Sequence, residues 1–330
     1  MWIPENTYIN ICKVAQEIYK NHYQEDCLNT ISVGTAQRPM TCSYMLEIPE
    51  EYRAQGFSYY DSMVCDAIYT LYKYEQSRIT PGDILQIMTM DEKARFYYTK
   101  GTVQKREKRL RESLKKLMNT RIVIDFREEV RLRELIDEDG NLLEGMVGGS
   151  LLPLEEAEEG KAYYFQEGRA LPVYEYAETI RQIIRVPKDL ISPYGVLGKL
   201  DFSSTDEVIQ LKRILIQRLE IMGNIRNNTN GQRIRYYGSG KEDGILPLIG
   251  IRKENFSMEA TVSAKTGREK TESRGWKNKV HDVDKKVCQI LDAYKECGYI
   301  EDYTQLRNGA RGLVRGIEIL GKVNRFSPRT

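Results

Sequence analysis

Lysine and arginine side chains concentrate in residues 100–121, which read KGTVQKREKRLRESLKKLMNTR. This stretch holds nine Lys or Arg residues and two glutamates, so its local net charge is +7. At ~100° per residue its apolar residues form one narrow face of a helix; they are Val103, Leu110, Leu114 and Leu117. The basic residues that we expect outside this face are Lys105, Lys108, Arg109, Lys115 and Lys116. Such side chains neutralise phosphates or reach base edges from the major groove, which predicts a DNA-binding helix. The alternative is a solvated basic face, but such faces usually mix both signs of charge.

A second set of basic residues lies toward the end of the sequence. Residues 265–286 hold eight Lys or Arg and four acids, and the helix expected there turns Lys285 and Lys286 away from its apolar stripe. Arg307, Arg311 and Arg315 then surround a short glycine-bearing turn, which suits the presentation of arginine to phosphates or to a minor groove. We therefore expect a second DNA-binding surface. Trp276 is expected to pack in the core at the start of this helix, with stacking on a base as the alternative.

Residues for enzymatic chemistry are scarce. Only two histidines occur, His22 and His281, which excludes an HExxH metal site and a nuclease built on paired histidines. Residues 316–322 have the spacing GxxxxGK, but Val323 stands where a nucleotide-binding loop needs Ser or Thr, and the segment predicts a strand. The sequence thus predicts no cofactor, no metal site and no catalysis. A tyrosine nucleophile with acidic metal ligands stays open, because the chain has 22 tyrosines, although half-buried packing with a polar tip explains them more simply.

The basic residues need elements that position them. Apolar spacing predicts a helix over residues 60–74, and the run Thr80-Pro81-Gly82-Asp83 predicts the start of a short helix over 81–88. The basic helix follows, and RIVIDF at residues 121–126 predicts a strand. A helix, a short helix, a basic helix and a strand occur in this order in a winged helix, whose third helix enters the major groove.

Acidic residues follow the basic ones. Residues 127–160 contain eleven Asp or Glu against three Arg. We interpret this segment as a long wing insertion that avoids DNA, or shields the basic helix until DNA arrives. A solvated acidic loop explains it more simply than a metal site does.

The second half of the chain predicts a second unit of the same kind. Residues 171–184 predict a helix, residues 188–202 are the best linker candidate, and Ser203 and Ser204 are expected to cap the next long helix. An offset of 177 aligns the two basic regions and predicts a weak internal repeat. It places Leu110 on Val287, Leu114 on Leu291, Leu117 on Tyr294, Val123 on Ile300, Asp125 on Asp302 and Phe126 on Tyr303.

Length and composition limit the class of protein. At ~100–200 residues per domain, 330 residues suit two domains. Lys and Arg number 50 against 48 Asp and Glu, which argues against both a uniformly basic coat and a disordered polyanion. The six cysteines lack a CxxC spacing, and we find neither a signal peptide nor an apolar run near the ~20 residues of a membrane span. We expect a soluble cytoplasmic protein with no membrane partner.

Several stretches together resemble plasmid or mobile-element replication initiators (Rep proteins) of the iteron-binding, tandem winged-helix class. These stretches are YYDSMVCDAIYTLY, ITPGDILQIM, KREKRLRESLKKLMNTRIVIDF, LPVYEYAE and KKVCQILDAYKECGYIEDY. The resemblance covers roughly residues 58–320 and lies in the order and pattern of the elements; the acidic segment departs from a compact wing. It implies an α+β fold of two tandem winged-helix domains with an N-terminal extension. The expected ranges are 1–57 for the extension, 58–190 for the first domain with its long acidic wing insertion, 203–320 for the second domain and 321–330 for a tail.

The resemblance also implies a function, which is non-enzymatic, sequence-specific binding of double-stranded DNA at a replication origin. In such initiators one winged helix reads DNA while the other assists binding or dimerises, and host replication proteins are recruited. Two other functions stay open. One is a transcriptional regulator of a mobile element that binds an operator, and the other is a protein-docking module whose winged helices have no affinity for DNA.

Overall fold

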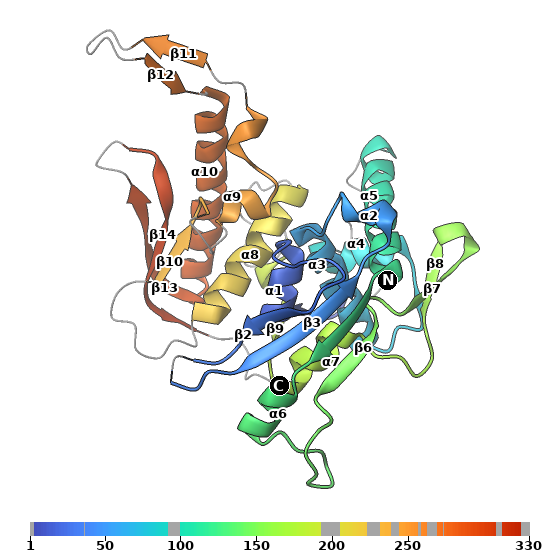
Figure 1. Ribbon diagram of the computed structural model, residues 1–330. Coiled ribbons are helices and arrows are strands. Elements are labelled where there is room, and N and C mark those ends of the chain that lie inside the picture. The colour runs from blue at the N-terminus through green and yellow to red at the C-terminus, as the bar shows by residue number, and fades with distance from the viewer. Residues whose placement is uncertain are drawn as a thin grey trace. The chain divides into compact units, whose positions relative to one another are not determined.

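The computed structural model describes residues 3–35, 37–91, 100–192, 205–222, 232–238, 244–256, 259–262, 269–272, 274–307 and 312–324. These residues form two compact units, and the chain passes from unit 1 to unit 2 after Lys188 (Figure 1). Each unit has its own core of buried apolar side chains. The fold is α+β, with small antiparallel sheets in both units, as expected.

Unit 1 contains a winged helix. In chain order its elements are α3 (Tyr59–Lys73), β4 (Arg78–Ile79), α4 (Pro81–Thr89), α5 (Lys100–Asn119), β7 (Leu154–Ala157) and β8 (Ala162–Phe165). The strands lie in the order β4-β8-β7, so the hairpin of β7 and β8 pairs through its second strand with the strand that precedes α4. This arrangement makes α5 the third helix and the β7–β8 hairpin the wing.

The starts of the first two helices follow the rules of helix capping. The Thr80 side chain accepts a hydrogen bond from the Asp83 backbone N–H (3.3 Å), and the Asp83 carboxylate accepts one from the Thr80 N–H (2.8 Å). Pro81 occupies the first turn, where its missing N–H costs no hydrogen bond. Ser58 and Asp61 make the same reciprocal pair at the start of α3. The short helix predicted from Thr80 is therefore confirmed, and it extends to Thr89.

A second sheet in unit 1 joins the first part of the chain to the segment after α5. Its strands are β2 (Asn29–Ser32), β3 (Thr41–Glu47), β5 (Arg121–Asp125) and β6 (Met146–Ser150), in the order β2-β3-β5-β6. Tyr44 and Leu46 on β3 lie opposite Ile124 and Ile122 on β5, and all four are buried. The strand predicted after the basic helix is present as β5, but it is not a strand of the wing, as the order of elements in a winged helix would suggest. An alternating pattern identifies a strand and its buried face without identifying its partner, which here lies in the expected extension.

The other elements of unit 1 bring its two ends together. They are β1 (Asn6–Asn10), α1 (Lys13–Tyr19), α2 (Glu50–Arg53), α6 (Arg127–Arg133), the 3-10 turn η1 (Glu158–Gly160), α7 (Pro172–Thr179) and β9 (Ile183–Pro187). β1 pairs with β9 in antiparallel fashion, from Asn6 opposite Pro187 to Asn10 opposite Ile183. The helix predicted to reach about residue 184 ends at Thr179, because Arg181 takes a left-handed conformation (φ 56°) and the chain turns into β9.

Unit 2 has the same topology as the winged helix of unit 1. Its elements are η2 (Lys188–Leu190), α8 (Asp206–Met222), β10 (Gln232–Arg235), α9 (Ile245–Leu248), η3 (Lys253–Asn255), β11 (Glu259–Val262), β12 (Glu269–Glu272), α10 (Arg274–Glu296), β13 (Ile300–Arg307) and β14 (Val314–Val323). The strand order β10-β14-β13 matches β4-β8-β7, and the β11–β12 hairpin is inserted before the third helix, α10. The GxxxxGK segment lies within β14, as predicted. At the start of α8 the Thr205 hydroxyl accepts from the Val208 N–H (3.4 Å); Ser203 and Ser204, which were expected to cap this helix, lie outside the described residues.

The internal repeat is confirmed for the helices and wrong for the strands. Leu110, Leu114 and Leu117 of α5 are fully buried, and so are their counterparts on α10. Val123, however, lies on β5, whereas Ile300 begins β13, whose counterpart by sheet order is β7. In unit 1 the segment from β5 to β6 separates the third helix from its wing, so an alignment with a constant offset cannot hold beyond the helix.

Candidate nucleic-acid interface

The third helix of unit 1 carries an exposed basic face. Lys105, Lys108, Arg109 and Lys115 are exposed, on the side of α5 away from its buried leucines. Lys108 has 79% of its side chain exposed and forms only a loose pair with Glu112, at 3.9 Å. Four of the five cations predicted on this helix therefore stand where a phosphate could reach them.

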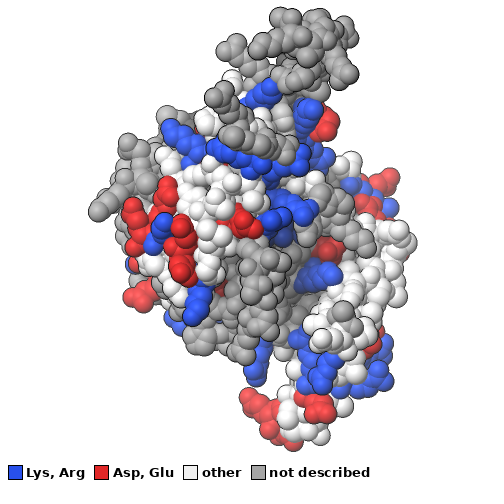
Figure 2. Space-filling model, turned by 90° about the vertical axis from the view of Figure 1, so that its left-hand side faces the viewer, with Lys and Arg blue, Asp and Glu red and all other residues white. Residues whose placement is uncertain are grey.

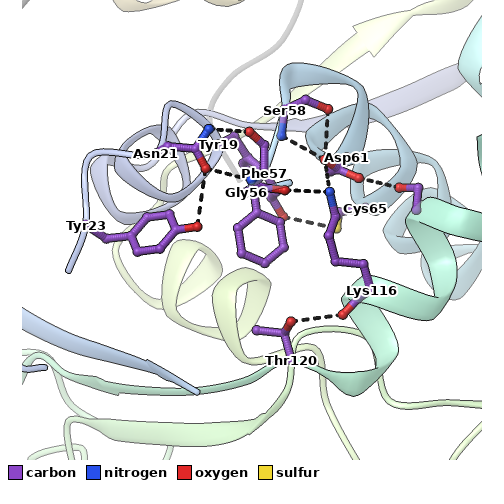
Figure 3. A network of polar contacts seen from close by, with 11 residues as sticks. Tyr19, Asn21, Tyr23, Gly56, Phe57, Ser58, Asp61, Cys65, Lys116 and Thr120 are labelled. Atoms are coloured by element: carbon purple, nitrogen blue, oxygen red, sulfur yellow. Dashed lines mark hydrogen bonds and ion pairs between the residues drawn. The ribbon is translucent and has the colours of Figure 1, made fainter. Parts of the chain in front are cut away.

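Lys116, the fifth predicted cation, is buried, so its predicted exposure is wrong. Its side chain is 9% exposed, and Nζ donates to Asp61 Oδ2 and to the Gly56 carbonyl, both at 2.8 Å. The ammonium also lies 5.1 Å from the centre of the Phe57 ring. Asp61 accepts further hydrogen bonds from Ser113 Oγ (2.6 Å) and from the backbone N–H of Ser58 (Figure 3). This polar cluster ties α5 to the start of α3.

The position of Lys116 on the helix explains why sequence patterning missed its burial. It lies about 120° from Leu110 around the helix, at the border of the apolar stripe. Arg109 lies on the same flank, with its guanidinium 3.9 Å from the centre of the Tyr60 ring of α3. The surface that α5 buries is thus wider than its apolar stripe, because α3 supplies a carboxylate and an aromatic ring to the cations beside it.

One cation of this surface was missed by sequence reasoning. Arg111 lies between the basic face and the wing, and its guanidinium donates to the Glu159 carbonyl at 3.2 Å. Together with Lys108 and Lys115 it lines a shallow hollow of about 280 Å³ on the outside of α5. The sequence could have predicted that Arg111 belongs to this surface, because on a helical wheel it lies next to Lys115 and Lys108.

The wing of unit 1 is acidic and short. Four of the eleven acids lie on β7 and at the tip, Glu155, Glu156, Glu158 and Glu159, whereas the others lie on α6 and in the segment that follows it. The prediction of one long acidic wing is therefore wrong, because the acidic residues are divided between the wing and α6 with the segment that follows it. At the tip, Arg78 pairs with Glu158 at 3.1 Å. Carboxylates at a wing tip repel phosphates, so this unit is suited to approach DNA with α5 and not with its wing.

The third helix of unit 2 presents fewer free cations than expected. Lys285 is exposed, but Lys286 is ion-paired with Glu207 (2.9 Å) and with Asp282 (2.8 Å). Lys279 pairs with the same glutamate at 2.6 Å. Although burial opposes its ionisation, the two ammonium groups hold the pKa of Glu207 below its usual value. Lys286 therefore lies outside the apolar stripe, as expected, but it is ion-paired with one carboxylate on α8 and with another on its own helix.

The wing of unit 2 is longer than that of unit 1 and ends in basic residues. Arg307 is exposed at the end of β13, where it donates to Gln305 Oε1 at 2.6 Å, and Arg315 is exposed near the start of β14. Arg311 lies outside the described residues. Figure 2 looks onto the side of the molecule on which β14 lies in Figure 1, and it shows Lys and Arg gathered on the upper part of that surface, apart from a red acidic group. Trp276 is buried against Phe256, with ring centres 5.6 Å apart, as the core interpretation predicts.

Several tyrosines of both units pack with their hydroxyls bonded to carboxylates. The Tyr176 hydroxyl donates to Glu129 (2.6 Å), and that of Tyr236 donates to Asp284 (2.7 Å). Burial, with the nearby carboxylates, raises the pKa of both tyrosines well above the usual value. A tyrosine held in its protonated form is a poor nucleophile, and among the described residues no cluster of His, Cys, Asp and Glu could hold a metal ion. In the same described part of the chain, no helix is long and apolar enough to cross a membrane.

Comparison with known proteins adds little to this picture. No family model and no curated protein matches the chain. A solved structure of domains 2 and 3 of RctB aligns with 79% of this chain and 94% of its own, at a TM-score of 0.32 and 10% identity. A likeness this low carries no weight for fold or function. The class of protein, an α+β protein with two winged-helix units, rests on the order of helices and strands in each unit.

Proposed function

We propose that the protein binds double-stranded DNA sequence-specifically at a replication origin of a plasmid or mobile element, as a non-enzymatic initiator. The observation that supports this most is the exposed basic face of α5, formed by Lys105, Lys108, Arg109 and Lys115 on the third helix of a winged helix. This helix is the one that enters the major groove in helix-turn-helix proteins. Origin binding would place the protein in the cytoplasm, with host replication proteins and a second copy of the chain as further partners.

The two units differ in the element that offers positive charge. Unit 1 combines a basic helix with an acidic wing, whereas unit 2 combines a mostly ion-paired helix with arginines on its wing strands. Under the proposal, unit 1 reads base edges through α5, and unit 2 contacts the backbone through Lys285, Arg307 and Arg315. Two units of one topology in one chain suit DNA that carries directly repeated sites.

The test is a footprint on DNA from the neighbourhood of the gene, at 50 and 200 mM salt. Protection of directly repeated sites that weakens steeply with salt supports the proposal. Protection of a single palindrome in a promoter favours a transcriptional regulator. If no DNA is protected at either salt concentration, DNA binding is contradicted, and a protein-docking module becomes the favoured function. If the protein nicks supercoiled DNA in the presence of a divalent ion, the proposal that it is non-enzymatic is contradicted.

A charge-reversal variant identifies the surface. Lys105→Glu, Lys108→Glu and Lys115→Glu together should abolish protection and leave the circular dichroism spectrum unchanged, because the three side chains are exposed. The matched control reverses three exposed arginines elsewhere in unit 1, Arg38→Glu, Arg131→Glu and Arg181→Glu. Both variants change the net charge equally. The proposal for α5 fails if the control loses binding as strongly as the triple variant does.

A further inference from the structure

The acidic segment that follows α6 folds into a small ordered hairpin, residues 134–144, here named the acidic hairpin. Ile136 and Leu142 form an antiparallel bridge, and the Leu143 N–H donates to the Leu135 carbonyl at 3.0 Å. At the turn, Asp137 Oδ1 accepts hydrogen bonds from the backbone N–H groups of Asp139 (3.0 Å) and Asn141 (2.8 Å). The backbone of the hairpin is therefore organised by its own hydrogen bonds.

The acidic hairpin presents apolar side chains to water. Ile136 and Leu142 are each 58% exposed, and because they lie directly opposite each other in the bridge they share one face. Two further exposed apolar residues lie at its base, Leu132 on α6 and Met146 on β6. Exposed apolar residues that share one face of an ordered element are typical of a protein interaction site, because their exposure to water costs free energy that a partner can recover.

The charge around these residues limits what the partner can be. Residues 134–144 hold five acids, Glu134, Asp137, Glu138, Asp139 and Glu144, and no Lys or Arg. This charge repels DNA and anionic lipid, and it complements a protein surface that carries Lys and Arg around an apolar groove. In Figure 2 the lower end of the molecule, where α6 lies in Figure 1, shows red acidic surface beside white uncharged surface, with blue basic surface directly above it.

The position of the hairpin in unit 1 leaves α5 accessible. β5 begins directly after α5 and leads away from it over five residues, or about 17 Å, to α6 and the hairpin. In Figure 1, α5 and α6 lie at opposite ends of β5. A protein bound at the hairpin would therefore not cover the basic face of the helix.

We propose that the acidic hairpin is the docking site for a partner protein that offers an apolar groove rimmed by Lys and Arg. Ile136 and Leu142 enter the groove, and the surrounding carboxylates pair with its rim. The proposal stands apart from DNA binding, since it uses none of the residues assigned to DNA.

The experiment captures the partner and then measures the complex with purified components. The full chain, with the photoreactive residue p-benzoylphenylalanine in place of the exposed Asn141, is produced in its own host and irradiated. The crosslinked protein is identified, purified and titrated calorimetrically against the unmodified full chain. We expect a 1:1 complex that weakens several-fold between 50 and 300 mM salt, and that weakens further when Lys or Arg residues on the partner's groove are replaced.

Variants decide whether the apolar pair carries the binding. Ile136→Ser with Leu142→Ser should lower the affinity at least tenfold and leave DNA binding and the thermal midpoint unchanged. The matched control is Leu28→Ser, which replaces another exposed apolar residue of unit 1 (69% exposed) and should not affect the complex. The proposal is overturned if no crosslink forms, or if the chain crosslinks only to lipid or to a second copy of itself. It is also overturned if the double variant binds the partner as tightly as the unmodified chain does. Loss of DNA binding in the charge-reversal variant of α5 has no bearing on this result.

Discussion

Lys116 of α5 and Asp61 of α3 form a buried ion pair at 2.8 Å, and Asp61 is at the same time the residue that completes the cap of α3. The carboxylate therefore both fixes the start of the first helix and holds the third helix against it. The exposed side chains that would contact DNA lie on the same helix, α5, so their position depends on this pair.

Removal of one partner of this pair should destabilise unit 1 strongly. Lys116→Met leaves Asp61 buried without its cation, and Asp61→Asn leaves the ammonium without its anion; each should cost about 3–5 kcal/mol of unfolding free energy. Urea denaturation followed by circular dichroism measures the loss. Lys108→Met, which removes one side of an exposed pair, serves as the control and should cost less than about 1 kcal/mol. Similar costs for Lys116 and Lys108 would contradict the role of the buried pair.

The acidic wing of unit 1 should weaken DNA binding. Glu155→Gln, Glu156→Gln and Glu159→Gln together remove three negative charges near α5 and keep Glu158, which pairs with Arg78. We expect the affinity for DNA at 50 mM salt to rise several-fold, and the gain to shrink at 300 mM salt, where charges are screened within about 6 Å. Fluorescence anisotropy of a labelled duplex measures both values.

A control separates the wing from net charge alone. Glu138→Gln, Asp139→Asn and Glu144→Gln remove the same charge from the acidic hairpin, at the far end of β5, and should change the affinity little. An equal gain in both variants would show that the wing has no specific effect on DNA binding.

The cluster of Glu207 with Lys279 and Lys286 should make unit 2 sensitive to acid. Although burial opposes ionisation, the lysines hold the pKa of Glu207 below its usual value. The ionised carboxylate therefore stabilises the fold at pH values above its unfolded pKa of about 4.3, and this stabilisation is lost as the pH falls through the lower pKa of the folded state. We expect the unfolding free energy of unit 2 to decrease below about pH 5. Trp276 fluorescence, in a Trp2→Phe background, reports on this unit. Glu207→Gln should lower stability at pH 7 by about 1 kcal/mol and flatten the acid dependence, whereas the exposed Glu254→Gln should do neither.

Lys212 should give unit 2 a second rise in stability, at alkaline pH. Its Nζ donates to the Ile191 carbonyl at 2.9 Å, and burial lowers the pKa of the ammonium to about 8. The unfolded chain then binds more protons than the folded one between about pH 8 and 10.4, so stability should rise with pH across this window. The rise is at most about 3 kcal/mol. The same fluorescence assay measures it, and a Lys212→Met variant without any loss of this rise would contradict the assignment.

Local patterns were sufficient for the helices of both units. Thr80, Pro81 and Asp83 predicted the start of α4, and Leu110 with Leu114 and Leu117 predicted the buried face of α5, because capping and helical periodicity depend on neighbours within a few residues. The basic face of α5 followed from the same periodicity.

Interactions between distant segments could not be predicted in the same way. The alternation in β5 identifies a strand but does not identify β3 as its partner, so its place outside the wing could not be predicted. The burial of Lys116 requires the carboxylate of Asp61. Lys286 pairs locally with Asp282, but its second ion pair is with Glu207, 79 residues away along the chain. In each case a side chain that would be exposed on an isolated helix is neutralised by an element that the helix meets only in the folded unit.

The pairing of β1 with β9 has a consequence for the synthesis of the protein. Asn6 lies opposite Pro187, so the first strand leaves the ribosome long before its partner exists. At about 5–20 residues per second, it waits on the order of 10–40 s with its backbone groups and the buried residues Ile9 and Ile11 unprotected. Unpaired strand edges of this kind promote aggregation. Slow translation, or crowded overexpression, should therefore reduce the yield of folded unit 1 more than that of unit 2, whose strands all follow one another within its own half of the chain.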